Sequence, residues 1–191
     1  MIDINDSIII MLNYDDDFFK NTFSKMEFLM GMDYMNKLIK KFDLPVIFTK
    51  RELNYKIKNN DIMKAKNKKE NKRIKNRPPE SSYDGKFLEQ FKNKTEIKNQ
   101  INVKKEDIFY NTDIENYIKE FHKNTLLFGG FFTDTDIFIS SIEANLREFN
   151  AIVVSDITST YSERLYFQSL EMISQFVDVI DTRDFMSMYD I

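Results

Sequence analysis

The segment from residue 125 to 162 places the tightest limit on how this chain can fold. It reads as an apolar strand, a Gly-Gly turn, a helix start rich in Thr and Asp, a helix, and a second strand that ends in Ser-Asp. Strands that alternate with helices through short connections indicate a parallel sheet covered by helices on both faces. The segment therefore predicts an α/β domain in three αβα layers.

The same alternation extends over most of the chain. Short apolar runs predict six strands, at residues 8–12, 46–49, 101–103, 126–128, 151–155 and 177–180. Helices are predicted at about residues 24–41, 112–121, 135–148 and 162–175. The Asp43-Leu44-Pro45 sequence ends the first helix, and the Thr112-Asp113-Ile114-Glu115 sequence fits a capping box that starts the second. We predict a single domain over residues 1–191, built on a mostly parallel, doubly wound sheet.

One long segment, at about residues 52–100, departs from this pattern. Between Lys56 and Arg77, ten Lys and Arg stand against two Asp and Glu, although the whole chain carries a net charge of −3. We predict a basic, mobile insertion here, with a helical stretch at about residues 85–92. A run of this kind is most often a solvated surface, and the alternative is salt-sensitive attraction to the phosphates of RNA or the ribosome. Base stacking is unsupported, because the only aromatic beside the run is Tyr55.

The composition excludes several classes of chemistry. The chain has no cysteine, which rules out disulfides, thiolate catalysis and Cys-ligated zinc. No apolar run reaches the roughly 18 residues that cross a bilayer, and the first residues are acidic where a signal peptide is basic. The single histidine, His122, is expected on the surface at a helix end. We expect a cytoplasmic protein without a membrane partner or a cofactor.

Ligands of parallel sheets bind beyond the carboxyl ends of the strands. Two polar clusters are expected there, at residues 13–17 after the first strand and at residues 129–136 after the fourth. Asp15 or Asp17 could approach Asp136 and form an acid/base pair or a site for a hard cation. The simpler alternative is that residues 15–17 solvate a loop and that Asp136 favours the start of its helix.

The second cluster resembles the active-site turn of the isochorismatase-like (cysteine hydrolase) family, whose signature runs roughly G-x-x-T-D-x-C-V. The turn keeps three of these identities, in Gly130, Thr133 and Asp134. Asp136 stands where the family has its cysteine nucleophile. The resemblance implies a cis peptide bond between Phe131 and Phe132, and an oxyanion hole made by the amides of Phe132 and Asp136.

The rest of the family's triad is also altered. The family's first strand is followed by Asp-x-Gln-x-Asp-Phe, which places its catalytic Asp on Asn13 and its Gln on Asp15. The family's catalytic Lys falls on Val103 by strict spacing, and on Lys104 if one residue is deleted. The nicotinamidase branch has a metal-binding histidine pair after the second strand, and residues 50–53 contain none, which implies that this metal site is absent.

The triad positions are therefore Asn13, Lys104 and Asp136. The residues at the first and third of these positions are poorly suited to acyl transfer. A helix start favours the ionised form of Asp136, which is a weak nucleophile and repels the charge that an oxyanion hole stabilises. Asn13 cannot shuttle a proton. We expect an inactive member of the family that acts as a binding or structural subunit, and the resemblance implies a homo-oligomer or another protein complex. The alternatives are a divergent hydrolase of a small molecule that uses Asp15 or Asp17 with Asp136, and RNA association through residues 56–77.

Overall fold

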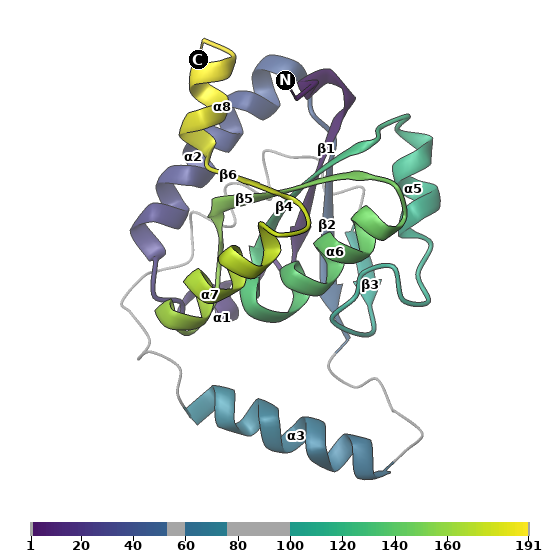
Figure 1. Ribbon diagram of the computed structural model, residues 1–191, viewed down its shortest axis with the longest axis vertical. Coiled ribbons are helices and arrows are strands. Elements are labelled where there is room, and N and C mark those ends of the chain that lie inside the picture. Colours follow the sequence, from purple (N-terminus) through teal and green to yellow (C-terminus); the bar gives the residue numbers. More distant parts are fainter. Residues whose placement is uncertain (1, 53–59, 76–99, 191) are drawn as a thin grey trace.

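Six parallel strands form one sheet at the centre of the molecule. The computed structural model describes residues 2–52, 60–75 and 100–190. The strand order is β3-β2-β1-β4-β5-β6, and every described pair of neighbours is parallel (Figure 1). The strands are β1 Ser7–Leu12, β2 Val46–Arg51, β3 Gln100–Val103, β4 Thr125–Phe131, β5 Asn150–Ser159 and β6 Asp178–Ile180. The six predicted strands and the doubly wound parallel sheet are thus confirmed.

The two central strands, β1 and β4, are buried along their whole length. A parallel strand covered on both faces needs apolar side chains at every position, which is why the continuous run in β1 identified it. The two strands lie close together where β4 ends. A side chain at Gly130 would clash with the Leu12 carbonyl oxygen, and the φ of Gly130 is +99°. Only glycine allows this close approach of the two strand ends.

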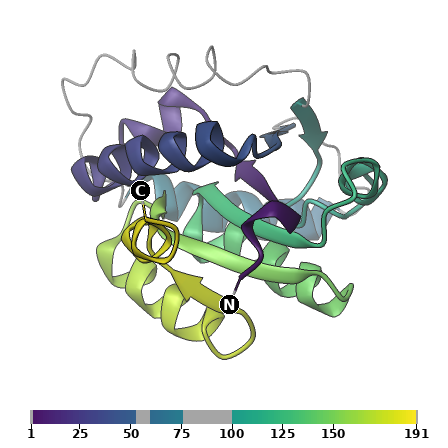
Figure 2. The same ribbon diagram turned by 90° about the horizontal axis from the view of Figure 1, so that it is seen from above.

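Helices cover both faces of the sheet, which confirms the predicted three layers. On one face, α2 (Lys25–Phe42) and α8 (Thr182–Met188) share a buried apolar cluster with the sheet. On the other face, α5 (Ile114–Glu120), α6 (Phe138–Leu146) and α7 (Glu163–Ile173) share a second one. Figure 2 shows the sheet between α2, in blue, and the green helices α6 and α7. The remaining described helices are η1 Ile4–Asp6, α1 Asp16–Phe19, α3 Asn60–Lys75 and η2 Thr133–Ile137.

Of two helix ends predicted from the sequence, one is confirmed and the other is wrong. The first long helix ends at Phe42, because Asp43 takes a left-handed conformation and its amide donates to the Ile39 carbonyl. The prediction of a capping box at residues 112–115 is wrong, because the N-cap of α5 is Asp113, one residue after the predicted Thr112. The Thr112 hydroxyl turns away from the helix and donates to the Ile108 carbonyl oxygen.

Three helical segments differ from the predictions. The helix expected at residues 135–148 begins as the π-helical turn η2 and continues as α6 to Leu146. The helix α8 was not predicted, although its N-cap Asp181 accepts hydrogen bonds from the amides of Arg183 and Asp184. The helix α3 was not predicted either, and it lies beyond the carboxyl ends of the strands (Figure 1). The stretch predicted as helical at residues 85–92 lies outside the described residues.

Within the described ranges, none of the helices combines the length and the apolar character that crossing a bilayer demands.

Candidate functional site

The chain leaves β1 toward one face of the sheet and leaves β4 toward the other, so the two strands flank the switch point of the sheet. Asn13 is the first residue after β1, and Asp136 lies in the η2 turn that follows β4. The Asn13 side-chain amide donates to Asp136 Oδ1 over 2.8 Å. The structure thus brings together two of the three predicted triad positions, at the place where ligands of such sheets bind.

The carboxylate of Asp136 is enclosed by hydrogen-bond donors. Besides Asn13, the Arg51 guanidinium donates to Oδ1, and the Thr135 hydroxyl donates to Oδ2 over 2.8 Å. Asp136 is only 1% exposed and Arg51 is 13% exposed at its side chain. A buried carboxylate is tolerated when a cation and hydrogen bonds compensate its charge, and this one has both.

Burial raises the pKa of Asp136 above its ordinary value, while the Arg51 charge and the hydrogen bonds from Thr135, Arg51 and Asn13 act in the opposite direction. The sequence led us to expect a helix start that favours ionisation. The structure instead places this residue inside a π-helical turn, where desolvation sets the direction of the shift. The pairing with a guanidinium, not a helix terminus, is what balances the charge of this carboxylate.

Asn13 is held in one orientation by its neighbours. Its Nδ2 donates to the Phe131 carbonyl oxygen and to Asp136 Oδ1, both over 2.8 Å. Turning the amide over would set its oxygen against these two acceptors, so the assignment of nitrogen and oxygen is unambiguous. Asn13 is 3% exposed, and among the described residues its Oδ1 has no hydrogen-bond partner. The φ of Asn13 is 47°, a left-handed conformation that asparagine tolerates better than most residues.

A chain of charges runs from the buried carboxylate to α3. Arg51, which pairs with Asp136, also lies 3.7 Å from Glu106 Oε1. Glu106 in turn accepts a contact of 2.7 Å from the Lys66 ammonium of α3. Burial pushes the pKa of Glu106 up, but the Lys66 hydrogen bond and the Arg51 charge leave it below its ordinary value. The helix that the sequence left unassigned is therefore linked to the candidate site.

Aromatic side chains surround the turn on the other side. The Phe131–Phe132 peptide bond is cis, which confirms what the resemblance implied. The Phe131 ring stacks on Phe28 at 5.1 Å between centroids, and the Phe132 ring contacts Phe18 at 4.9 Å and Tyr161 at 4.7 Å. Both Phe131 and Phe132 are buried. These rings exclude solvent from the turn, while the oxyanion hole at the amides of Phe132 and Asp136 stays a prediction.

The two alternative acids, Asp15 and Asp17, are more exposed than Asp136. The Asp17 side chain is 86% exposed and contacts Lys20 at 3.3 Å. The Asp15 carboxylate accepts the amide of Asp17 over 2.9 Å, which is how an N-cap residue starts the short helix α1. The structure does not gather these carboxylates around Asp136.

The cation beside Asp136 is Arg51, which the sequence analysis did not single out. Lys104, the predicted triad lysine, directly follows β3 and is half-buried, and its role stays a prediction. Arg51 is the last residue of β2, the strand next to β1. Its position at the carboxyl end of a neighbouring strand was the one signal that could have identified it.

No group of three or more His, Cys, Asp and Glu that could hold a metal ion occurs within residues 2–52, 60–75 and 100–190. The arrangement at the switch point is thus a closed, charge-paired network of Asn13, Arg51 and Asp136.

Solved structures with the same fold are hydrolases by their names. The chain is similar to a cysteine hydrolase from Pseudomonas syringae pv. phaseolicola 1448A, with 13% identity, a TM-score of 0.73, and 97% of this chain and 93% of that chain covered. It is similar to the Escherichia coli YcaC gene product, described as an octameric hydrolase of unknown specificity, with 17% identity, a TM-score of 0.67, and coverages of 94% and 77%. It is similar to a Staphylococcus aureus nicotinamidase, with 12% identity, a TM-score of 0.64, and coverages of 93% and 99%.

Sequence comparison gives a sharper result. No sequence among the curated proteins matches this one significantly. The sequence pattern of the isochorismatase domain, however, matches residues 7–184, from the first residue of β1 into α8. That range contains all six strands of the sheet together with Asn13, Arg51 and Asp136. The chain belongs to the isochorismatase family.

Proposed function

We propose that this member of the family has lost the acyl-transfer chemistry of its relatives and acts as a binding or structural subunit. One observation carries the proposal: the residue at the nucleophile position is a carboxylate, 1% exposed, with both oxygens engaged by donors. A catalytic group must come within hydrogen-bond reach of the substrate atom it attacks or deprotonates. Asp136 can do so only if Arg51 and Asn13 first release it.

The charges at this site also oppose the family's reaction. Acyl transfer builds negative charge on an oxyanion, which preorganised donors stabilise. Here the donors already serve the Asp136 side chain, and in its ionised form that side chain would repel a second negative charge nearby. The amide of Asn13 neither gains nor loses a proton near neutral pH, so it cannot act as a general acid or base. The geometry therefore supports a structural role for the triad positions.

The divergent hydrolase with Asp15 or Asp17 as its second acid has less support. It needs two carboxylates within a few ångströms of each other in an enclosed pocket. Asp17 is exposed and paired with Lys20, and Asp15 is engaged at the start of α1. These placements favour the simpler reading, in which both residues serve the loop and helix that follow β1.

The test is a turnover assay of the full chain with nicotinamide, isochorismate and simple amides. We expect no turnover above the blank. Asp134→Ala is the matched control for Asp136→Ala, because Asp134 lies in the same η2 turn and is not a triad position. Turnover that disappears in Asp136→Ala and survives in Asp134→Ala would overturn the proposal, with circular dichroism confirming that both variants fold.

A second candidate function is RNA association through residues 56–77. The observation that favours it is α3 itself, a 16-residue helix with exposed lysines along its length. Four of them line a groove on the helix surface: Lys64, Lys68, Lys72 and Lys75. Phosphate contacts of this kind weaken steeply as salt rises. Binding of a single-stranded RNA that is unaffected by salt, or by deletion of residues 56–77, argues against this function.

Self-association is the third part of the proposal. One structural neighbour is named as an octamer. This chain exposes large apolar side chains on two helices, Met26 and Met30 on α2 and Phe167 and Met172 on α7. Exposed apolar surface of this kind often marks an interface. Light scattering coupled to size exclusion should give a mass above that of the 22.9 kDa chain, and a monomer at all concentrations would contradict this part. The cytoplasmic location stays a prediction.

A further inference from the structure

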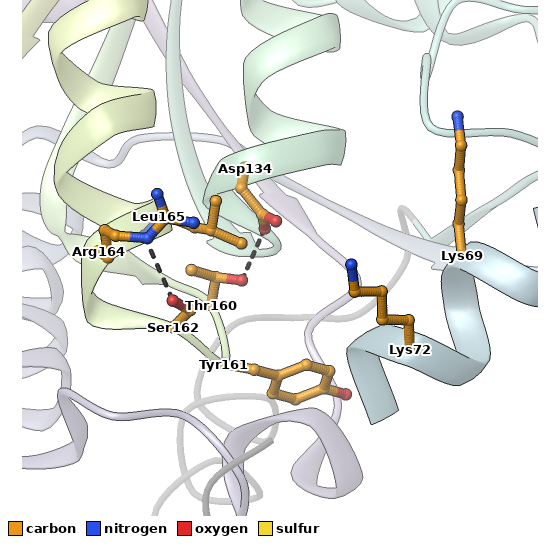
Figure 3. A pocket seen from close by; sticks show the side chains of 8 residues that line it. All are labelled: Lys69, Lys72, Asp134, Thr160, Tyr161, Ser162, Arg164 and Leu165. Carbon is orange, nitrogen blue, oxygen red and sulfur yellow. Dashed lines mark hydrogen bonds between the residues drawn. The ribbon is translucent and has the colours of Figure 1, made fainter. Parts of the chain in front are cut away.

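A cavity of about 390 Å³ lies beside the triad positions, at the same edge of the sheet. Three elements form it: the η2 turn after β4, the segment from the end of β5 into α7, and the face of α3 (Figure 3). None of Asn13, Arg51 and Asp136 lines it. The volume falls within the range of small-molecule sites, which begins at roughly 300 Å³.

The charged groups that line this cavity are mostly cations. Lys69 and Lys72 line the cavity from α3, and Arg164 lines it from the first turn of α7 on the opposite side. In Figure 3 the Lys72 side chain points toward the α7 side, whereas the Lys69 side chain extends along the edge of the cavity. Lys69 and Lys72 are three residues apart, a spacing that places both on one face of a helix. Among the described lining residues the carboxylate is Asp134, which already accepts the Thr160 hydroxyl over 2.6 Å. The cavity therefore favours an anion.

The start of α7 adds to this field. Ser162 is its N-cap, with extended backbone angles, and its side chain accepts the Leu165 amide over 3.4 Å. The other amides of the first turn have no partner within the helix, and they carry the positive end of its dipole toward the cavity. A helix start with arginine and lysines around it is a common setting for phosphate groups.

The remaining wall is apolar and partly rigid. Tyr161 and Leu165 line the cavity, and the Tyr161 ring packs against Phe132 with centroids 4.7 Å apart. An aromatic ring held by another ring offers a flat surface to a planar ligand. The cavity thus combines a cationic side with an aromatic side, which matches a compound that carries both an anionic group and a ring.

We propose that this cavity binds a small phosphate monoester with a planar ring, the phosphate contacting Lys69, Lys72 and Arg164 and the ring contacting Tyr161. This proposal rests on the proposed function, because it names a ligand for a protein that binds small molecules without turning them over. Helix α3 completes the site, and the Lys66–Glu106 contact links it to the domain. The same helix carries lysines outside the cavity, which allow a test for general attraction between charges.

The test measures binding of phenyl phosphate to the full chain by calorimetry at constant ionic strength. The cavity variant is Lys69→Gln with Lys72→Gln and Arg164→Gln. The matched control is Lys64→Gln with Lys68→Gln and Lys75→Gln, which removes the same number of charges from the part of α3 that lies outside the cavity. We expect the cavity variant to lose about tenfold or more in affinity, and the control to lose less than about threefold.

Each other outcome counts against the proposal. Equal losses in the two variants would mean general attraction between charges, as in RNA binding. The absence of measurable binding to the unsubstituted chain at millimolar phenyl phosphate would overturn the site. Inorganic phosphate that binds as tightly as phenyl phosphate would overturn the role of Tyr161. The cavity contains none of Asn13, Arg51 and Asp136, so a failure to bind phenyl phosphate leaves the lost chemistry standing. Turnover in the amide assay would overturn the proposed function, and the binding measurement tells the two failures apart.

Discussion

Asn13 and Asp136 form a matched pair of residues. The resemblance predicts that the family's Asp and Cys fall on these two positions, where this chain has Asn and Asp. An Asp at position 13 would place a second carboxylate where the Asn13 amide now donates to Asp136 Oδ1 and to the Phe131 carbonyl oxygen. The two acceptors need a donor between them, and the amide supplies two N–H groups. Asn at position 13 and Asp at position 136 are therefore expected to depend on each other.

The Asn13→Asp variant tests this pairing. It should lower the free energy of unfolding at pH 7 by about 2–3 kcal/mol, because it buries an uncompensated like charge beside Asp136. Urea denaturation measures the change. In the Asp136→Asn background the same substitution should cost clearly less, since the repelling partner is gone. An equal cost in the two backgrounds would show that the two residues are not coupled.

At the scale of elements, α3 is a largely polar helix that an ion pair with Glu106 joins to the rest of the domain. An isolated helix of its length is marginally stable in water, so its order depends on its contacts with the domain. The contact between Lys66 and Glu106 is the ion pair that joins it to the residues around Arg51. A partly exposed ion pair contributes roughly 1 kcal/mol or less, enough to shift a weak equilibrium.

The Lys66→Gln variant should loosen α3 while leaving the sheet intact. Hydrogen exchange of the α3 amides should speed up severalfold, because the undocked helix frays. Lys64→Gln is the control, since Lys64 contacts only Asp61 of its own helix among the ion pairs described. Equal exchange in the two variants would mean that the Lys66–Glu106 contact does not hold the helix.

Acidification should release the same helix in a defined pH range. The pKa of Glu106 lies below its ordinary value of 4.5 in the folded chain, so the ion pair contributes fully above that value and is lost as the pH falls through the lowered pKa. The NMR amide shifts of α3 should hold steady from pH 7 to about 5 and change only below about 4.5. A change between pH 7 and pH 6 would point to another group.

Patterns in the sequence identified the elements that carry a strong local signal. The apolar runs of β1 and β4 and the spaced apolar residues of α2 were sufficient, because burial on both faces or on one helix face shapes the sequence directly. The helix α3 was missed because it is mostly polar and lacks a continuous apolar face. Arg51 was missed because its partner Asp136 is 85 residues away in the chain, and only the sheet order brings the two together.

At the scale of the whole molecule, the family's fold is kept, and Asp136, the predicted nucleophile position, is buried in the interior. The network of Asn13, Arg51 and Asp136 lies where β1 and β4 diverge, at the centre of the sheet. Residues kept for chemistry are commonly poor for stability, and replacing them often makes a protein more stable. A residue that balances a buried charge has the opposite effect, because its removal leaves the partner charge uncompensated.

The free energy of unfolding of the Asp136→Ala variant therefore tests the central claim most directly. A carboxylate that neutralises Arg51 in the interior should, when removed, lower this free energy by about 3 kcal/mol. Asp134→Ala, in the same turn, should lower it by less, because Asp134 is partly exposed. If urea denaturation shows Asp136→Ala to be as stable as the unsubstituted chain, or more stable, the account is contradicted.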